Sequence, residues 1–276
     1  MLHARRFLLA LALLVPLATP LATFAQIKTP DDADASAVWD KVRPSLFDNR
    51  PIEVVGAARV IELEAPVRAE DAAVVPISIH TNIEQTAAKY IDAVYLLIDN
   101  NPSPVAGIFH FTPRSGRADI ETRVRINDYG FVRVIAEMND GSLYMASQWV
   151  KASGGCSAPA SKDPAEALAT LGKMKFLHAR ELVDGQPNLV QLMISHPNNS
   201  GLAMDQSTRQ YAPSHYVRNI EVSYGGKRVM SADLDISISE NPNFRFYVVP
   251  EANGGVLKAE VEDSHDQRFE AAQRLQ

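Results

Sequence analysis

The chain has 276 residues, of which 46% are hydrophobic and 22% are charged. This is enough apolar material for a substantial core, and it excludes a largely disordered chain. Acidic residues outnumber basic residues by 33 to 27, so the formal net charge is −6 and the composition does not favour binding to nucleic acid. The single cysteine, Cys156, excludes a disulfide framework within the chain.

The N-terminus has the features of a secretory signal peptide. Arg5 and Arg6 precede an apolar run that begins at Phe7, and small residues lie before a cleavage site after Ala25. Two prolines interrupt this run, which is short of the roughly 20 apolar residues that span a bilayer, so no membrane anchor is expected after cleavage. We therefore expect an acidic periplasmic protein, with the export route open between the general secretory and twin-arginine pathways.

Short helical patterns flank the strands. Residues 31–47 carry apolar side chains at roughly helical spacing, and Pro44 is expected to end or bend this helix. A second helix is expected to be capped by Asp163, to begin at Pro164 and to close at Gly172.

Strand patterns occur on both sides of a central segment that is poor in large side chains. In the first half the expected strands are residues 74–80, 93–98, 107–111, 117–126, 131–138 and 142–150. In the second half they are residues 175–183, 189–195, 220–224, 228–234, 244–249 and 256–262. Asn139-Asp140-Gly141 and Gly225-Gly226 indicate hairpin turns. The pattern predicts an all-β protein made of two β-sandwich domains.

The stretch from residue 117 to 126 alternates most clearly. One side is expected to be buried and holds Ala118, Ile120, Thr122, Val124 and Ile126. The other side is expected to face solvent and holds Asp119, Glu121, Arg123 and Arg125.

The only cysteine lies in a segment with almost no bulky side chains. Residues 152–162 contain no apolar side chain larger than alanine apart from Cys156 and Pro159, so a flexible surface linker is expected. Gly154 and Gly155 would give this arm its flexibility. The alternative is a small buried hydrophobe, the usual environment of a free cysteine. An exposed, mobile thiol favours shuttling between proteins, whereas a sulfur enclosed in a packed interior would contradict it.

A thiol on a mobile arm favours a carrier over an enzyme. A catalytic thiol needs a base held within hydrogen-bonding reach by a rigid scaffold, which a glycine-flanked linker does not provide. The sequence also lacks a GxSxG elbow, a phosphate-binding loop and an HExxH zinc motif. We therefore expect no catalytic residues, with Cys156 as a covalent carrier site.

No cofactor or metal is expected. The histidines of the mature chain show no compact ligand spacing, and neither histidine nor methionine follows the cysteine closely enough for a cupredoxin-type copper site. His110 is expected to point away from the two phenylalanines beside it. Acid pairs such as Glu62 with Glu64 and Asp233 with Asp235 fit solvated strand faces better than acid–base catalysis.

Two sets of motifs resemble the sulfur-oxidation carrier proteins SoxY and SoxZ. VPISIH at 75–80, DNNPSPVAGIFHFTP at 99–113 and the Gly154-Gly155-Cys156 arm resemble SoxY. MISHPNNSGL at 193–202 and the stretch at 212–246 resemble SoxZ. The resemblance is greatest to fused carriers associated with quinoprotein dehydrogenases. It implies immunoglobulin-like sandwiches that pair within the chain and a cysteine that carries sulfur intermediates.

The expected organisation is a signal peptide at 1–25, a SoxY-like domain at 26–151, a flexible linker at 152–162 and a SoxZ-like domain at 163–276. The expected partners are periplasmic sulfur-oxidising enzymes, with thiosulfate-type cargo. The alternative is a periplasmic adaptor that binds a quinoprotein dehydrogenase or its cytochrome, in which case the thiol is incidental.

Overall fold

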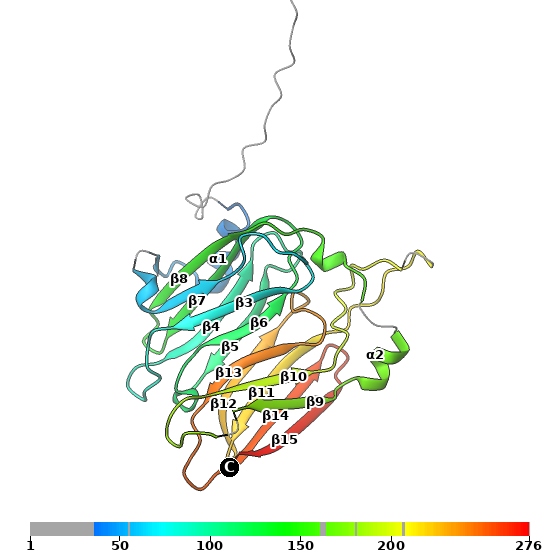
Figure 1. Ribbon diagram of the computed structural model, residues 1–276. Helices are drawn as coiled ribbons and strands as arrows, with labels where there is room; N and C mark the ends of the chain where they lie inside the picture. The colour runs from blue at the N-terminus through cyan, green and yellow to red at the C-terminus, as the bar shows by residue number, and fades with distance from the viewer. Residues whose placement is uncertain (1–35, 55, 161–163, 180, 206–207, 276) are drawn as a thin grey trace, which may run out of the picture.

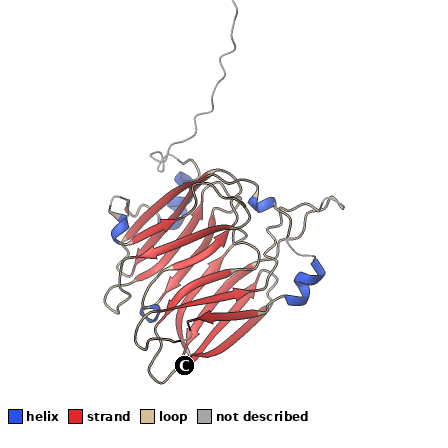
Figure 2. Ribbon diagram, viewed as in Figure 1, coloured by secondary structure: helices blue, strands red, loops and turns tan. Residues whose placement is uncertain are grey.

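The computed structural model describes residues 36–54, 56–160, 164–179, 181–205 and 208–275 (Figure 1). Strands dominate, and they form two sheets packed face to face, with short helices at the periphery (Figure 2). The expected all-β class is therefore confirmed. The expected signal peptide at 1–25 lies outside the described residues.

The larger sheet has nine strands, and all neighbours are antiparallel except β1 and β8. In spatial order the strands are β1 (Ile52–Glu53), β8 (Leu143–Val150), β7 (Gly130–Met138), β4 (Ile91–Ile98), β5 (Val105–Phe111), β12 (Lys227–Leu234), β11 (Val217–Tyr224), β14 (Gly255–Asp263) and β15 (Arg268–Leu275).

The smaller sheet has six antiparallel strands. In spatial order they are β2 (Ile61–Glu64), β3 (Val75–Thr81), β6 (Ile120–Val124), β13 (Asn243–Val248), β10 (Asn188–Ile194) and β9 (Met174–His178). The first half of the chain supplies β2, β3 and β6, and the second half supplies the other three.

The two halves join edge to edge in both layers. In the larger sheet β5 pairs with β12, and in the smaller sheet β6 pairs with β13. Phe109 of the first half packs against Phe244 of the second half, with 6.1 Å between ring centroids. One continuous cluster of buried side chains spans both halves, so the two modules share a core and do not hang apart on a linker.

Five helices are present in the described parts of the chain: α1 (Trp39–Phe47), η2 (Ala57–Arg59), η3 (Pro113–Ser115), η4 (Gly155–Ser157) and α2 (Pro164–Thr170). The two expected helices are confirmed as α1 and α2, with Pro44 inside α1. The capping role expected of Asp163 falls outside the described residues. None of these helices is long and apolar enough to cross a membrane.

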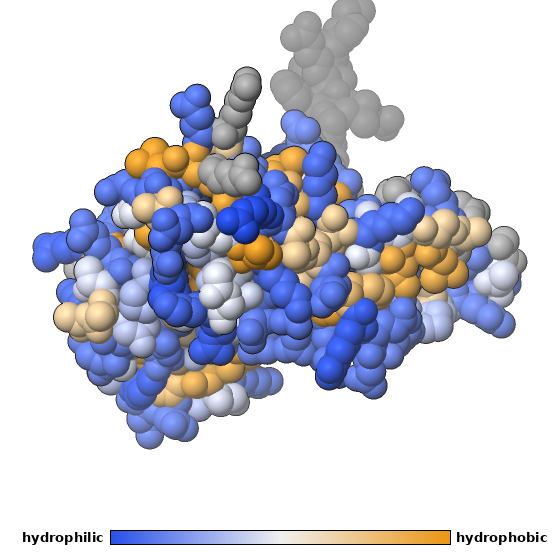
Figure 3. Space-filling model, turned by 90° about the horizontal axis from the view of Figure 1, so that it is seen from below, coloured by the Kyte–Doolittle hydropathy of each residue, from blue (hydrophilic) through white to orange (hydrophobic). Residues whose placement is uncertain are grey.

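Helix α1 covers part of the outer face of the larger sheet. Trp39 and Phe47 are buried in a second, smaller apolar cluster with Leu97, Ile135 and Met145, side chains that point away from the main core. Elsewhere the surface seen from below is mostly hydrophilic, and its apolar patches are separated by polar side chains (Figure 3).

The alternation around β6 is confirmed on its buried side and wrong in part on the other side. All five residues of the expected buried face have at most 5% of their surface exposed. Glu121 and Arg123 are half-buried, but Asp119 and Arg125, which were expected in solvent, are buried. Asp119 accepts hydrogen bonds from Thr81, and the surroundings of Arg125 belong to the candidate site.

Candidate functional site

The expected exposed, flexible arm is docked onto the first module. Cys156 has no exposed surface and Ala152 is 5% exposed, whereas Gly154 and Ser157 face solvent. The expectation of an exposed thiol is therefore wrong, and the sulfur is enclosed, which was the observation expected to contradict shuttling. A shuttling thiol would require the turn to leave this position first. Small side chains do remove anchors from a segment, but they also allow its backbone to lie close against a neighbouring backbone, and here the second effect decides.

The glycines seat the turn by close backbone packing. The amides of Gly154 and Gly155 donate to the carbonyls of Asn127 and Ile126, each at 2.9 Å. A Cβ atom at position 155 would lie 2.0 Å from the carbonyl oxygen of Ala72, so no side chain fits there. Gly154 has φ of +82°, which starts the short helix η4 and turns the Cys156 side chain inward. The glycines thus fit the arm tightly to the module.

The second module covers the same turn. The hydroxyl of Ser200 donates to the carbonyl oxygen of Cys156. Arg125 spans both modules: its Nη1 donates to the carbonyl of Gly155 at 3.4 Å, and its Nη2 donates to that of Asn198 at 3.2 Å. The thiol is therefore enclosed where the segment 196–201, which we call the covering loop, meets the end of the first module.

Burial controls the chemistry of the sulfur. Desolvation raises the pKa of the Cys156 thiol from 9.0 to about 11, and the nearby Arg125 opposes this rise. The same burial lowers the pKa of Arg125. At neutral pH the docked thiol is protonated, and because the thiolate is the nucleophile, the docked state is chemically quiet.

A groove of about 460 Å³ lies beside the docked turn. It is lined by Arg123 and Arg125 from the β6 region, by Ala158 and Pro159 after the cysteine, and by neighbouring side chains of both modules: Asp71, Ala73, Val74, Glu240 and Asn241. Arg125 belongs both to this groove and to the enclosure of the sulfur.

The structure also brings together three groups that the sequence spacing did not reveal. His196, His215 and Asp263 are buried, with ligand atoms within 4.8 Å of one another. His215 Nε2 lies 2.7 Å from Asp263 Oδ2, and His196 Nε2 lies 3.5 Å from the same oxygen. These residues are distant in the sequence, so only the fold could reveal their proximity.

Hydrogen bonding gives this cluster a structural role. The amide of Asn198 donates to His196 Nδ1, so the neutral ring keeps its proton on Nε2 and offers no lone pair to a metal there. Desolvation lowers the pKa of His196 to about 4, which keeps the ring neutral. His196 begins the covering loop, and its contacts fix that loop to β14.

The remaining sequence candidates are scattered. His110 points away from the buried Phe109 and Phe111 and lies 3.4 Å from Asp233, as expected of a surface strand residue. Asp233 also accepts from Asn219, whereas Asp235 accepts from Ser103. These acids do not share a cleft with Cys156.

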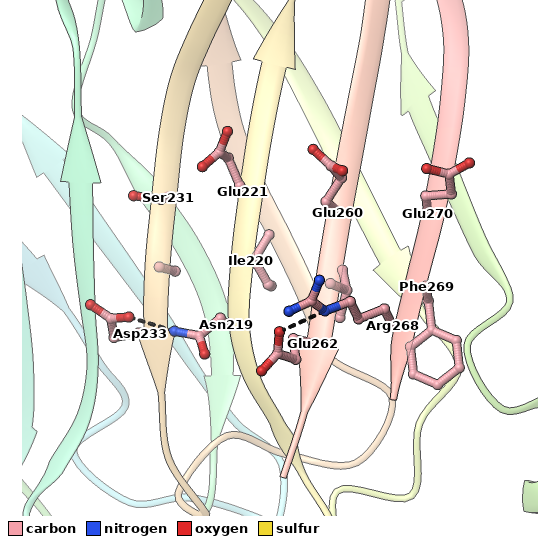
Figure 4. A pocket seen from close by; sticks show the side chains of 12 residues that line it. Asn219, Ile220, Glu221, Ser231, Asp233, Glu260, Glu262, Arg268, Phe269 and Glu270 are labelled. Atoms are coloured by element: carbon pink, nitrogen blue, oxygen red, sulfur yellow. Dashed lines mark hydrogen bonds and ion pairs between the residues drawn. The ribbon is translucent and has the colours of Figure 1, made fainter. Parts of the chain in front are cut away.

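A larger hollow, about 610 Å³, lies on the outer face of β11, β12, β14 and β15. In Figure 4 the carboxylates of Glu221, Glu260 and Glu270 line up across three neighbouring strands. Lys258 pairs with two of them, Glu260 and Glu270, so much of the charge is compensated. This face is a solvated sheet surface with no thiol beside it.

The fold and the site define a class of protein: two β-sandwich modules that share their sheets and enclose one cysteine where they meet. Residues 45–156 match the family described as sulfur oxidation protein SoxY, and residues 175–274 match the family described as sulphur oxidation protein SoxZ. The chain belongs to this family of sulfur-oxidation carriers as a fusion of a SoxY and a SoxZ domain. Such SoxY–SoxZ units are non-catalytic sulfur carriers.

The expected pairing of the two modules within the chain is confirmed. The SoxY match extends to Cys156, five residues past the boundary expected at 151, and the domain boundaries stay predictions. A search among curated proteins finds no match to the chain.

Some solved structures show weak likeness. A superoxide reductase (neelaredoxin) from Ignicoccus hospitalis is 20% identical, with 45% of this chain and 94% of that chain covered and a TM-score of 0.31. A β-glycosidase from Bacteroides vulgatus is 11% identical, with coverages of 78% and 24% and a TM-score of 0.25. At such TM-scores these likenesses carry no argument about this chain.

Proposed function

We propose that the chain carries sulfur compounds covalently on Cys156 for processing by periplasmic partner enzymes. The observation that carries the proposal is that the SoxY match ends at this residue, so Cys156 occupies the end of the SoxY domain. It is also the only cysteine of the chain. The cargo would be held through a disulfide-type bond, and joining a thiol to thiosulfate in this way releases two electrons, which a partner oxidoreductase must accept.

The enclosed thiol adds a step to this function, because a partner cannot reach the sulfur until the turn leaves its seat. Between Ser153 and Ala160 the cysteine is the only side chain without exposed surface, so undocking exposes little apolar area. The contacts to be broken are mainly four hydrogen bonds, those of Gly154, Gly155, Arg125 and Ser200. Local opening of this kind needs far less free energy than global unfolding.

Opening would also activate the sulfur. In water the pKa of the thiol returns toward its ordinary value of 9.0, so the thiolate fraction at neutral pH rises about a hundredfold relative to the docked state. The carrier would thus be protected when docked and reactive when presented.

Intact-mass measurement of protein taken directly from the periplasm tests this proposal. We expect added mass of sulfur or sulfonate groups that reductant removes, and no such adduct on Cys156→Ser. An unmodified mass in the presence of thiosulfate and the partner enzymes would overturn the proposal.

The burial of Cys156 favours a second candidate, an adaptor that binds a quinoprotein dehydrogenase or its cytochrome. A buried, protonated cysteine is typical of a structural residue. The binding of a quinoprotein dehydrogenase is itself part of this second proposal. Cys156→Ser separates the two candidates, because an adaptor keeps its role in the cell and a carrier loses it.

A further inference from the structure

Arg125 is a buried cation whose charge is not matched by an ion pair. Only 4% of its surface is exposed, and its two hydrogen-bond partners are the carbonyl oxygens of Gly155 and Asn198. Its Nε has no hydrogen-bond partner. Among the described residues, no carboxylate lies within 4 Å of this guanidinium. The carboxylates of Glu240 and Asp71 act on its charge without forming an ion pair with it. A buried charge without a contacting counter-ion is unfavourable, so an anion in direct contact would stabilise it.

Arg133 shows how the same molecule treats another buried arginine. Its Nε and Nη2 each donate to Asp99 at 2.8 Å, which forms a two-pronged ion pair with no exposed surface on the arginine. At this position a carboxylate contacts the buried guanidinium directly. No such partner reaches Arg125, which borders the thiol and the groove instead.

The surroundings of Arg125 point to where the anion would lie. The charge of Arg125 opposes the rise in the pKa of the Cys156 thiol. In turn, Cys156, Glu240 and Asp71 oppose the fall that burial causes in the pKa of Arg125. The groove beside the turn offers about 460 Å³, and Arg123 adds a second positive charge to its lining. Asp71 and Glu240 also line it, so the groove holds two acidic and two basic side chains.

We propose that Arg125 forms an anion subsite that holds a sulfonate-type group attached to Cys156 in the docked turn. This inference rests on the proposed carrier function and names the residue that would hold the cargo. A guanidinium donates in a planar fork that suits the oxygens of a sulfonate. Nε has no partner, and each Nη makes one hydrogen bond and carries a second N–H, so a fork of donors is still available. An anionic cargo would form a direct ion pair with the buried guanidinium, whereas a neutral or cationic cargo would not.

Two thiol reagents of equal chain length test this charge preference. The 2-sulfonatoethyl and 2-(trimethylammonio)ethyl methanethiosulfonates differ in the sign of the charge that they attach. In each case the thiol loses its proton to water, the thiolate attacks the sulfenyl sulfur, a disulfide forms and methanesulfinate leaves with the electron pair. The reagent is the oxidant, so no other reactant is needed.

The measurement is the rate at which dithiothreitol releases each adduct from the full chain. The quantity compared is the ratio of the anionic to the cationic release rate in the wild type, divided by the same ratio in Arg125→Gln. Intrinsic differences between the two disulfides cancel in this double ratio. We expect a double ratio of about one tenth, because Arg125 protects the anionic adduct in the wild type and cannot do so in the variant. A double ratio near one would overturn the subsite.

Two further variants make the result specific. Arg228→Gln removes the same charge from an exposed position on β12. Its ratio of anionic to cationic release rates should equal that of the wild type. Arg125→Lys keeps the charge but loses the fork and should retain part of the protection. Equal loss in Arg228→Gln and Arg125→Gln would show a general charge effect and would contradict the proposal.

The wild-type protein gives a second measurement that does not depend on the folding of any variant. The anionic adduct should raise the Tm relative to the cationic adduct, and equal Tm values would overturn the subsite. Because both adducts are synthetic, this result is independent of the native cargo. Failure to find a native adduct by mass would overturn the carrier function, whereas failure here would overturn only the role of Arg125.

Discussion

The two modules meet at two junctions of different character. At the seam between β5 and β12, five residue pairs continue the larger sheet, and the rings of Phe109 and Phe244 lie against each other in the shared core. At the second junction, the Cys156 turn lies against the covering loop. Ser200 and Arg125 make hydrogen bonds to the turn, and the residues of the turn have small side chains.

The difference shows which contact can open. Separating the seam would expose large apolar side chains, each worth about 1.5–3 kcal/mol of burial free energy, together with a row of backbone hydrogen bonds. Undocking the turn would expose little apolar surface, and each hydrogen bond that passes to water contributes about 1 kcal/mol. The seam is therefore the permanent junction, and the turn is the one that can open at the lower cost in free energy.

The largest expected effect lies at the seam. Phe109→Ala would leave a cavity in the shared core and lower the free energy of unfolding by about 3–5 kcal/mol. Urea unfolding followed by circular dichroism measures this change. Val67→Ala, at a side chain that is 62% exposed, is the control and should change the stability by less than about 0.5 kcal/mol. If Phe109→Ala lowers the free energy of unfolding only slightly, the seam does not contribute substantially to the stability of the two modules.

The next effect concerns the seat of the turn. Gly155→Ala would place a Cβ 2.0 Å from the carbonyl oxygen of Ala72, so the turn must move off its seat. We expect Cys156 to react with a thiol-specific chromogenic disulfide roughly tenfold faster or more, since the docking bonds are worth on the order of 1–3 kcal/mol. The folded core should remain.

Gly141→Ala is the matched control for the turn. It makes the same chemical change in a distant hairpin, at φ of +84° and with no atom within 4 Å of the new Cβ. The backbone strain there should lower stability without changing the reactivity of the thiol. A faster reaction in both variants would contradict a specific seat for the turn.

A third prediction concerns pH. Burial raises the pKa of the Cys156 thiol from 9.0 to about 11, so docking favours the protonated form. This contribution to stability is complete below pH 9 and is lost as the pH rises through 11, to a total of about 3 kcal/mol. The difference in unfolding free energy between wild type and Cys156→Ser should shrink across this window. A difference that is independent of pH would contradict the docked, protonated thiol.

The smallest expected effect comes from the covering loop. Ser200→Ala removes the hydroxyl that donates to the carbonyl of Cys156, at about 1 kcal/mol, so labelling of the thiol should accelerate a few-fold. Ser157→Ala, at an exposed hydroxyl that bonds only within the turn, should accelerate it less. Equal rates for the two variants would show that the second module does not hold the turn.

Local patterns predicted most of the fold. The alternation of strand residues and the turns at Gly141 and Gly225-Gly226 depend on neighbouring residues, and these elements lie within a few residues of their expected positions. Strand β15 was not expected, because half of its side chains are polar and two of the others are alanine. It is held by pairing with β14, which no local pattern reveals.

The features of the site that the sequence did not predict depend on contacts between segments that are distant in the sequence. The burial of Cys156 depends on Ala72 and Ile126 from the first module and on Ser200 from the second. Composition alone indicated a loose segment, because small residues suit both a mobile linker and a tightly seated backbone. The approach of His196, His215 and Asp263 has the same origin in tertiary packing.

The cysteine is tethered on both sides, since β8 ends at Val150 and α2 begins at Pro164. A fully extended chain spans at most about 3.3–3.6 Å per residue, so six residues carry the sulfur roughly 20 Å from the end of β8. Under the proposed function, two backbones would enter a partner together, one leading to the cysteine and one returning from it. An enzyme that acts on cargo at Cys156 would then need an entrance wide enough for a hairpin and a reaction centre no deeper than that length.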